Sequence, residues 1–126
     1  MSKGRIIFVG VHNKPGMEPL DSRTKSGKII DEVIAGLEGM KCLKTNLSDV
    51  YEIPQLPIER QSHASKWRKK YSPTSDDVII LLGRTVQFRF PSASSYKTVF
   101  AAHPASRHHK REEYIQNLIK QINEQR

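Results

Sequence analysis

Two uninterrupted apolar runs constrain the fold of this chain more than any other feature. They are Ile6–Val9, which lies between Gly4 and Gly10, and Val78–Leu82, which lies between Asp77 and Gly83. A strand with one face in water alternates apolar and polar residues, whereas a strand covered on both faces is apolar throughout. The two runs therefore predict buried strands of a parallel sheet that has helices on both faces.

The other segments have the patterns that such a sheet needs. From Gly27 onward apolar residues recur at helical spacing, with Ser26 as the expected N-cap and Gly36 or Gly39 as the end of the helix. The remaining predicted elements are strands at Cys42–Asn46 and Thr98–Ala102 and helices at Ile58–Tyr71, Arg84–Phe90 and His109 to the C-terminus. Strands separated by helices predict one three-layer α/β/α domain over residues 1–126, with a four-stranded parallel sheet.

Cysteine content and apolar run length indicate the compartment. The single Cys42 excludes an internal disulfide, which fits a reducing environment. The apolar run at Ile6 is too short for a signal peptide, and no stretch approaches the roughly 20 apolar residues that span a bilayer. We therefore expect a cytoplasmic protein with no membrane contact.

The charge of the chain indicates its partner. Lys and Arg number 21 against 13 acidic residues, which gives a formal net charge of +8. Such a balance favours a polyanionic partner, with nucleic acid ahead of an anionic membrane surface. A general solubility charge is the alternative, and the charge alone does not decide between them.

The loop after the first strand contains polar groups suited to ligand binding. Ligands of open α/β sheets bind beyond the carboxyl ends of the strands, and this strand is predicted to run from Arg5 to Val11. In the loop that follows, Asn13 can donate and accept hydrogen bonds, His12 can titrate near neutrality, and the Ser26 helix start suits phosphate. Neither G-x-G-x-x-G nor G-x-x-x-x-G-K-[ST] is present, so an ordinary turn-rich loop is the alternative.

The segment AAHPASRHHKR follows the fourth predicted strand. His103, fixed by Pro104, is expected to face the same crevice as the first loop. The basic residues from Arg107 to Arg111 are unfavourable at a helix N-terminus unless an anion offsets the dipole, which predicts a phosphate-contacting surface. For His108 and His109 a solvated pair is the alternative.

Other chemistry-bearing residues are weaker candidates. The segment KWRKKY, Lys66–Tyr71, mixes basic and aromatic residues as nucleic-acid-binding segments do, and a solvated helix face with Trp67 as its buried anchor is the alternative. The histidines lack metal-ligand spacing, so we expect no metal. Cys42 is expected to be a core residue rather than a nucleophile.

Five segments resemble, in order, the uracil-DNA glycosylase superfamily. IIFVGVHNKPG and VFAAHPASRHHKR resemble its two active-site motifs, and between them EPLDSRTKSGKIIDEVI, LKTNLSDV and DVIILLGRTVQFRF resemble the first helix, the base-recognising strand and the third strand. The resemblance covers nearly the whole chain. It implies strand order 2-1-3-4 and, because the cysteines of the iron–sulfur branch are missing, no cofactor.

The resemblance also implies roles for individual residues. Asn13, in preference to His12, takes the catalytic place in the first motif, and His103 takes it in the second. Asn46 recognises the base. The remaining implied positions are Gly10 and Leu20 beside the base, Asp21 or Glu18 as a general base, and Arg23, Lys25, Ser26, Ser106, Arg107 and Lys110 on the DNA.

The implied function is a monomeric DNA glycosylase of base excision repair, associated with the nucleoid if the source is prokaryotic. Such an enzyme flips a uracil or a related modified or mismatched base out of DNA and hydrolyses its N-glycosidic bond. The alternative is a catalytically degenerate module of the same fold that binds nucleic acid or nucleotides. A purely protein-binding role comes third.

Overall fold

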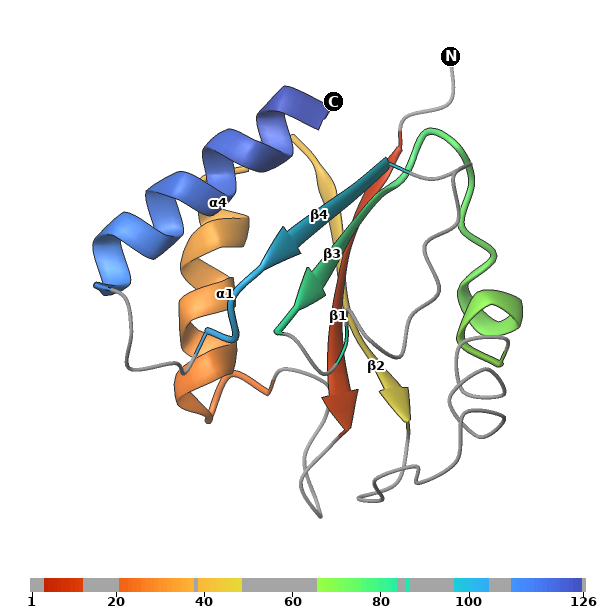
Figure 1. Ribbon diagram of the computed structural model, residues 1–126, viewed down its shortest axis with the longest axis horizontal. Helices are drawn as coiled ribbons and strands as arrows, with labels where there is room; N and C mark the ends of the chain where they lie inside the picture. The colour runs from red at the N-terminus through yellow and green to blue at the C-terminus, as the bar shows by residue number, and fades with distance from the viewer. Residues whose placement is uncertain are drawn as a thin grey trace.

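The chain forms a four-stranded parallel sheet with strand order β2-β1-β3-β4 (Figure 1). This computed structural model describes residues 4–12, 21–37, 39–48, 66–83, 86, 97–104 and 110–125. The strands are β1 (Arg5–His12), β2 (Lys41–Ser48), β3 (Val78–Leu82) and β4 (Lys97–Ala101). The predicted parallel sheet and its strand order are therefore confirmed.

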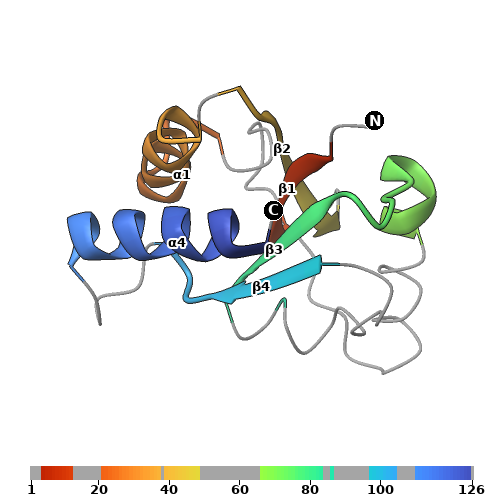
Figure 2. The same cartoon turned by 90° about the horizontal axis from the view of Figure 1, so that it is seen from above.

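Helices cover both faces of the sheet. Helices α1 (Lys25–Ala35) and α4 (Arg111–Gln125) lie on one face, and the helix at residues 66–71 lies on the other (Figures 1 and 2). Alternate residues of the central strands point to opposite faces. Ile6 and Phe8 of β1 therefore pack in the core under α1 and α4, whereas Ile7 and Val9 pack with Trp67 in a second core. The predicted α/β layering is confirmed in the described residues.

Helix α1 begins two residues earlier than an N-cap at Ser26 would place it. Thr24 has an extended backbone, and its Oγ1 accepts a hydrogen bond from the N–H of Gly27 at 3.0 Å. The same hydroxyl donates to the carbonyl oxygen of Asp21 at 2.7 Å, which fixes its orientation. Ser26 is therefore a residue of the first turn, and its assignment as N-cap was wrong. The predicted end at Gly36 is confirmed.

Four other predicted elements have different boundaries in the structure. Strand β1 ends at His12 rather than at Val11, and β2 runs from Lys41 to Ser48 rather than from Cys42 to Asn46, since the two strands are paired as far as His12 and Ser48. Strand β4 lies one residue earlier than expected, and α4 begins at Arg111 rather than at His109. Residues 66–71 are the described part of the helix expected at Ile58–Tyr71, and of the segment Arg84–Phe90 only Val86 is described.

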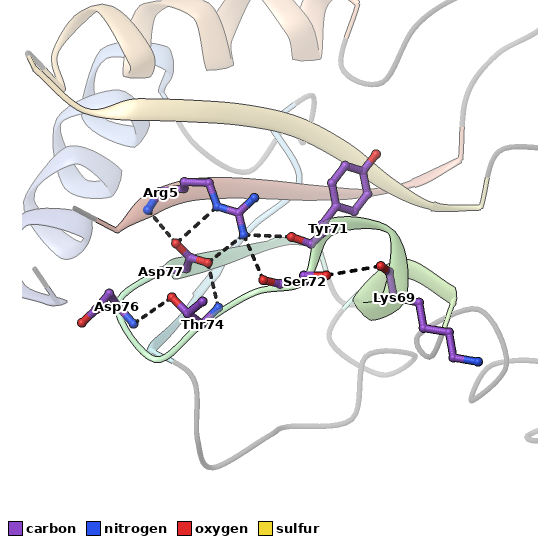
Figure 3. A network of polar contacts seen from close by, with 7 residues as sticks. All are labelled: Arg5, Lys69, Tyr71, Ser72, Thr74, Asp76 and Asp77. Atoms are coloured by element: carbon purple, nitrogen blue, oxygen red, sulfur yellow. Dashed lines mark hydrogen bonds and ion pairs between the residues drawn. The ribbon is translucent and has the colours of Figure 1, made fainter. Parts of the chain in front are cut away.

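A network of charged and polar groups joins β1 to β3 at their amino ends (Figure 3). The Arg5 backbone N–H donates to Asp77 Oδ1 at 2.7 Å, and Arg5 Nη2 donates to Asp77 Oδ2 at 2.9 Å and to the carbonyl oxygen of Tyr71 at 2.8 Å. The Thr74 N–H donates to Asp77 Oδ2 at 2.8 Å. We call these four residues the Arg5–Asp77 network. It attaches the helix at residues 66–71 to the sheet.

The Asp77 carboxylate is buried, with only 3% of its side chain exposed. Burial alone would raise the pKa of Asp77, but the hydrogen bonds from Arg5 and Thr74, together with the Arg5 charge, hold it below its usual value. A carboxyl group with a lowered pKa in the folded state stabilises the fold above its unfolded pKa of about 3.9. That stabilisation is lost as the pH falls through the folded pKa.

We therefore predict that Asp77→Asn lowers the free energy of unfolding by about 2 kcal/mol at neutral pH, since hydrogen bonds to charged groups contribute about 1.5–3 kcal/mol. The difference from wild type should begin to narrow as the pH falls below about 4, where the unfolded chain takes up the proton, and should vanish once the pH is below the lowered pKa of folded Asp77. Urea unfolding followed by circular dichroism at several pH values measures both effects.

The exposed ion pair between Arg111 and Glu32 supplies the control. Its Nε–Oε2 distance is 2.8 Å, but each side chain is 51% exposed. Glu32→Gln should therefore cost less than about 0.5 kcal/mol. Equal losses for Asp77→Asn and Glu32→Gln would contradict the special role of the Arg5–Asp77 network.

Candidate functional site

The carboxyl ends of the strands and the N-terminus of α1 lie at the same edge of the molecule (Figure 1). Of the predicted site residues, Gly10, Asn46 and His103 are described there. Asn13, Glu18, Leu20, Ser106 and Arg107 lie outside the described residues, and so does the side chain of His12. The site below is therefore built from the described residues alone.

Asn46 and Gly10 are brought into direct contact. They are paired in the parallel register of β1 and β2, and Asn46 is 7% exposed. A Cβ atom built on Gly10 would lie 2.5 Å from Asn46 Oδ1, closer than real Cβ contacts come. Glycine at this strand position therefore makes the room in which the Asn46 side chain lies. A buried amide held this way is suited to hydrogen-bond one polar ligand edge selectively.

Lys44 of β2 contacts a residue of α1 and a residue of the turn that precedes α1. Its Nζ forms an ion pair with Asp31 Oδ1 and donates to Ser22 Oγ at 3.3 Å. Burial would raise the pKa of Asp31, but hydrogen bonds from Lys44 and Ser22 and the Lys44 charge lower it. Residues 44 and 46 point to the same face of β2, so this ion pair lies on the same side of the strand as Asn46. The prediction from sequence missed Lys44, although its alternation with Cys42 and Asn46 placed it on that face.

His103 follows β4, the edge strand opposite to β2, and lies beside Gly83. Gly83 has a φ of +97°, and a Cβ atom built on it would lie 3.4 Å from His103 Cβ. Its N–H donates to the carbonyl oxygen of Ala101 at 2.8 Å, which continues the pairing of β3 with β4. His103 itself is exposed. An imidazole in this position can donate or accept a hydrogen bond with a ligand above the sheet.

Asn46 and His103 are at the same edge but on the two outer strands. With a spacing of about 4.8 Å between neighbouring strands, β2 and β4 are about 14 Å apart. A single small ion therefore cannot bind to both side chains. A ligand that contacts both side chains has to lie between them, over the ends of β1 and β3, as a planar heterocycle could.

The cationic residues at this edge are exposed, and one of them, Arg23, also forms an ion pair. Lys25 and Lys110 are exposed next to the first turns of α1 and α4. Arg23 is also exposed, but its Nε and Nη2 donate to the two carboxylate oxygens of Asp21 at 3.0 and 2.7 Å. Since Asp21 Oδ1 accepts the Arg23 backbone N–H as well, Asp21 is poorly placed to act as a general base. Ser26 is partly buried in the first turn of α1.

The expected dipole mismatch at the start of α4 was wrong. Glu112 and Glu113 lie in the first turn of the helix, where negative charge is favourable. Arg111 forms its ion pair with Glu32 of α1. The helix start is therefore compensated by its own acidic residues, and it does not require a bound phosphate.

Trp67 has a structural role. It is 2% exposed, and its Nε1–H donates at 2.8 Å to Thr45 Oγ1, which in turn donates to the carbonyl oxygen of Phe8. Its ring cannot stack on a nucleic-acid base, so the alternative interpretation of this segment, a buried anchor, is confirmed for Trp67. The Lys66, Lys69 and Lys70 side chains on the same helix are exposed.

Other types of site find no support among the described residues. No group of three His, Cys, Asp or Glu side chains that could hold a metal ion occurs among them. Cys42 packs against the core on the α1 side, and burial raises the pKa of its thiol, which disfavours the nucleophilic thiolate. None of the helices in the described ranges is long and apolar enough to cross a bilayer.

The contact between Gly10 and Asn46 gives a test of the site geometry. Gly10→Ala should lower the free energy of unfolding by about 1–3 kcal/mol, because the added methyl group overlaps the Asn46 amide. In an Asn46→Ala background the same change should cost less than about 1 kcal/mol, since the next neighbour, Thr45 O, would lie 3.7 Å from the new Cβ. Denaturant unfolding of the four proteins measures this coupling. Additive losses would show that the amide does not occupy this position.

Comparison with known proteins adds no family assignment. No family model matches the sequence, and no significant match was found among curated proteins. Function is therefore inferred from the fold and from the residues at the carboxyl edge.

Proposed function

We propose that the chain is a DNA glycosylase that removes a uracil or a related modified or mismatched base in base excision repair. The observation that supports this most is the position of Asn46: a buried amide, held over Gly10 at the carboxyl end of β2. The strand order β2-β1-β3-β4 and the presence of His103 at the same edge agree with the arrangement that the family resemblance implies.

Asn46 is proposed to read the base. Its amide oxygen accepts and its amide nitrogen donates, which matches the paired donor and acceptor on one edge of a uracil-like base. A base that presents the wrong pattern sets donor against donor or acceptor against acceptor at the buried amide, and such mismatches cost a factor of about 10⁴ or more in favourable cases. The Gly10 contact contributes by holding the amide in place before the base arrives.

His103 is proposed to assist bond cleavage. The target nucleotide is first flipped out of the helix, which costs a few kcal/mol. When the C1′–N bond breaks, the electron pair stays on the base, and the sugar becomes cationic until water adds to C1′ and releases a proton. An imidazole N–H of His103 stabilises the negative charge on the departing base, as an oxyanion donor does. Asn13, outside the described residues, is proposed to hold the water, with His12 as its alternative.

The cationic residues are proposed to hold the DNA backbone. Lys25 and Lys110 flank the carboxyl edge and are exposed, and Arg23 lies nearby with Asp21 as its partner. Ser26, Ser106 and Arg107 complete the proposed set, the last two outside the described residues, and Leu20 is proposed to lie beside the flipped base. The net charge of +8 supports attraction to a polyanion. The enzyme would act as a monomer in the compartment that contains the genome, the cytoplasm in a prokaryote.

The experiment that tests this function is incubation with labelled oligonucleotides that contain uracil, other modified bases or mismatches, followed by alkali to reveal abasic sites. His103→Ala should slow base release under saturating protein by about a hundredfold, since the loss of one oxyanion-type donor has this effect. Its DNA affinity should stay close to that of wild type.

Lys25→Ala is the matched control, because it should weaken DNA binding without slowing the saturated rate. If wild type releases a base and His103→Ala releases it equally fast, the proposed role of His103 is wrong. If no base is released but the oligonucleotides bind, the catalytically degenerate binding module is the better description.

DNA binding itself should depend steeply on salt. Each lysine–phosphate contact contributes about one unit to the slope of log K against log salt, so Lys25→Ala with Lys110→Ala should reduce that slope by about two. Fluorescence anisotropy with a labelled oligonucleotide measures the slope. A flat salt response, together with saturable binding of a free nucleoside, would instead support a nucleotide-binding module.

A further inference from the structure

We propose that Tyr114 of α4 is a positioning residue for His103. This inference rests on the proposed role of His103 in base release. The Tyr114 hydroxyl donates to the carbonyl oxygen of Ala102 at 2.6 Å, and Ala102 is the residue immediately before His103. The contact therefore joins α4, which contains Tyr114, to the residue that directly follows β4.

The backbone that leads into His103 is held at consecutive residues. The carbonyl oxygen of Ala101 accepts the Gly83 N–H at 2.8 Å, and the carbonyl oxygen of Ala102 accepts the Tyr114 hydroxyl. On the other side Pro104 is buried, and a proline restricts the residue before it to extended conformations. His103 is thus an exposed side chain on a backbone that is fixed before and after it.

Tyr114 is well suited to hold this carbonyl group. Its ring belongs to the core under α1 and α4, with 8% of the residue exposed, so the hydroxyl projects from a rigid support. Burial raises the pKa of the Tyr114 hydroxyl well above its usual value, so the group keeps its proton and remains a donor at neutral pH. Its own backbone N–H donates to the carbonyl oxygen of Lys110 at 2.9 Å at the start of α4.

The hydroxyl group of Tyr114 can be removed without changing the packing of its ring. Phenylalanine would fill the same core volume as the tyrosine ring. The hydroxyl therefore determines where the segment from Ala102 to His103 lies more than it determines whether the protein folds.

The test is Tyr114→Phe, studied by two independent measurements. The first is the imidazole Cε1–H resonance of His103 by NMR, assigned by its absence in His103→Gln. It should broaden or shift in Tyr114→Phe. The second is base release under saturating protein, which should slow by about tenfold with a DNA dissociation constant within about twofold of wild type, since misplacement costs less than loss of the group.

Ile122→Val is the matched control. It removes a methyl group from the same core, eight residues further along α4, which is about 12 Å along the helix axis. Its His103 resonance and its rate of base release should both equal those of wild type, although its thermal midpoint falls.

The outcomes separate this inference from the proposed function. An unchanged His103 resonance in Tyr114→Phe overturns the inference, and so does an equal change in Ile122→Val. If wild type releases no base from any oligonucleotide, the proposed function fails. The His103 resonance alone then decides whether Tyr114 positions that side chain.

Discussion

The parallel register of β1 between β2 and β3 is the constraint on which the rest of the structure depends. Ile6–Val9 of β1 are fully buried, with Ile6 and Phe8 in the core under α1 and α4 and Ile7 and Val9 in the second core, so a slip of one residue would exchange these two sets between the cores. The same register brings Arg5 to Asp77 at one end of the strand and Gly10 to Asn46 at the other. One strand alignment therefore creates both the Arg5–Asp77 network and the candidate site.

The two ends of the sheet differ in chemistry. At the amino ends the charges are paired: Asp77 accepts hydrogen bonds from Arg5 and Thr74, and its carboxylate is almost fully buried. At the carboxyl ends two glycines lie where side chains would fill the space, and Asn46 and His103 lie next to them. The buried carboxylate therefore lies at the amino edge, whereas the candidate ligand-binding side chains lie at the carboxyl edge, where open α/β sheets bind ligands.

The sequence predicts the layers of this fold well, because the spacing of apolar residues within one segment determines its secondary structure and its buried face. Consecutive apolar residues identify β3 without error, and the helical spacing of apolar residues from Gly27 onward identifies α1. Strand order could not be read from periodicity, and it came from the resemblance to the uracil-DNA glycosylase superfamily. Boundaries were less certain where two signals competed. Both Thr24 and Ser26 can cap a helix, and the contact of Thr24 with Asp21 decided between them.

The candidate site could be predicted only in part, since it depends on contacts between distant segments. Ligands of open α/β sheets bind beyond the carboxyl ends of the strands, and this rule indicated Asn46 and His103. It did not indicate Lys44, whose ion pair with Asp31 joins a strand to a helix. The contact of Tyr114 with Ala102 has no local signal either, because it joins residues 12 positions apart across a helix start. The acidic residues Glu112 and Glu113 were visible in the sequence, and weighing them would have corrected the interpretation of α4.

The central claim is that one nucleic-acid ligand contacts Asn46 and His103 together at the carboxyl edge. It is tested most directly by NMR titration of the protein with a uracil-containing oligonucleotide, following the Asn46 side-chain amide and the His103 imidazole. We predict that both sets of resonances move with the same binding curve, while the backbone amide of Arg5, at the opposite edge, stays in place. Movement at the Arg5 edge with neither Asn46 nor His103 affected would contradict the claim.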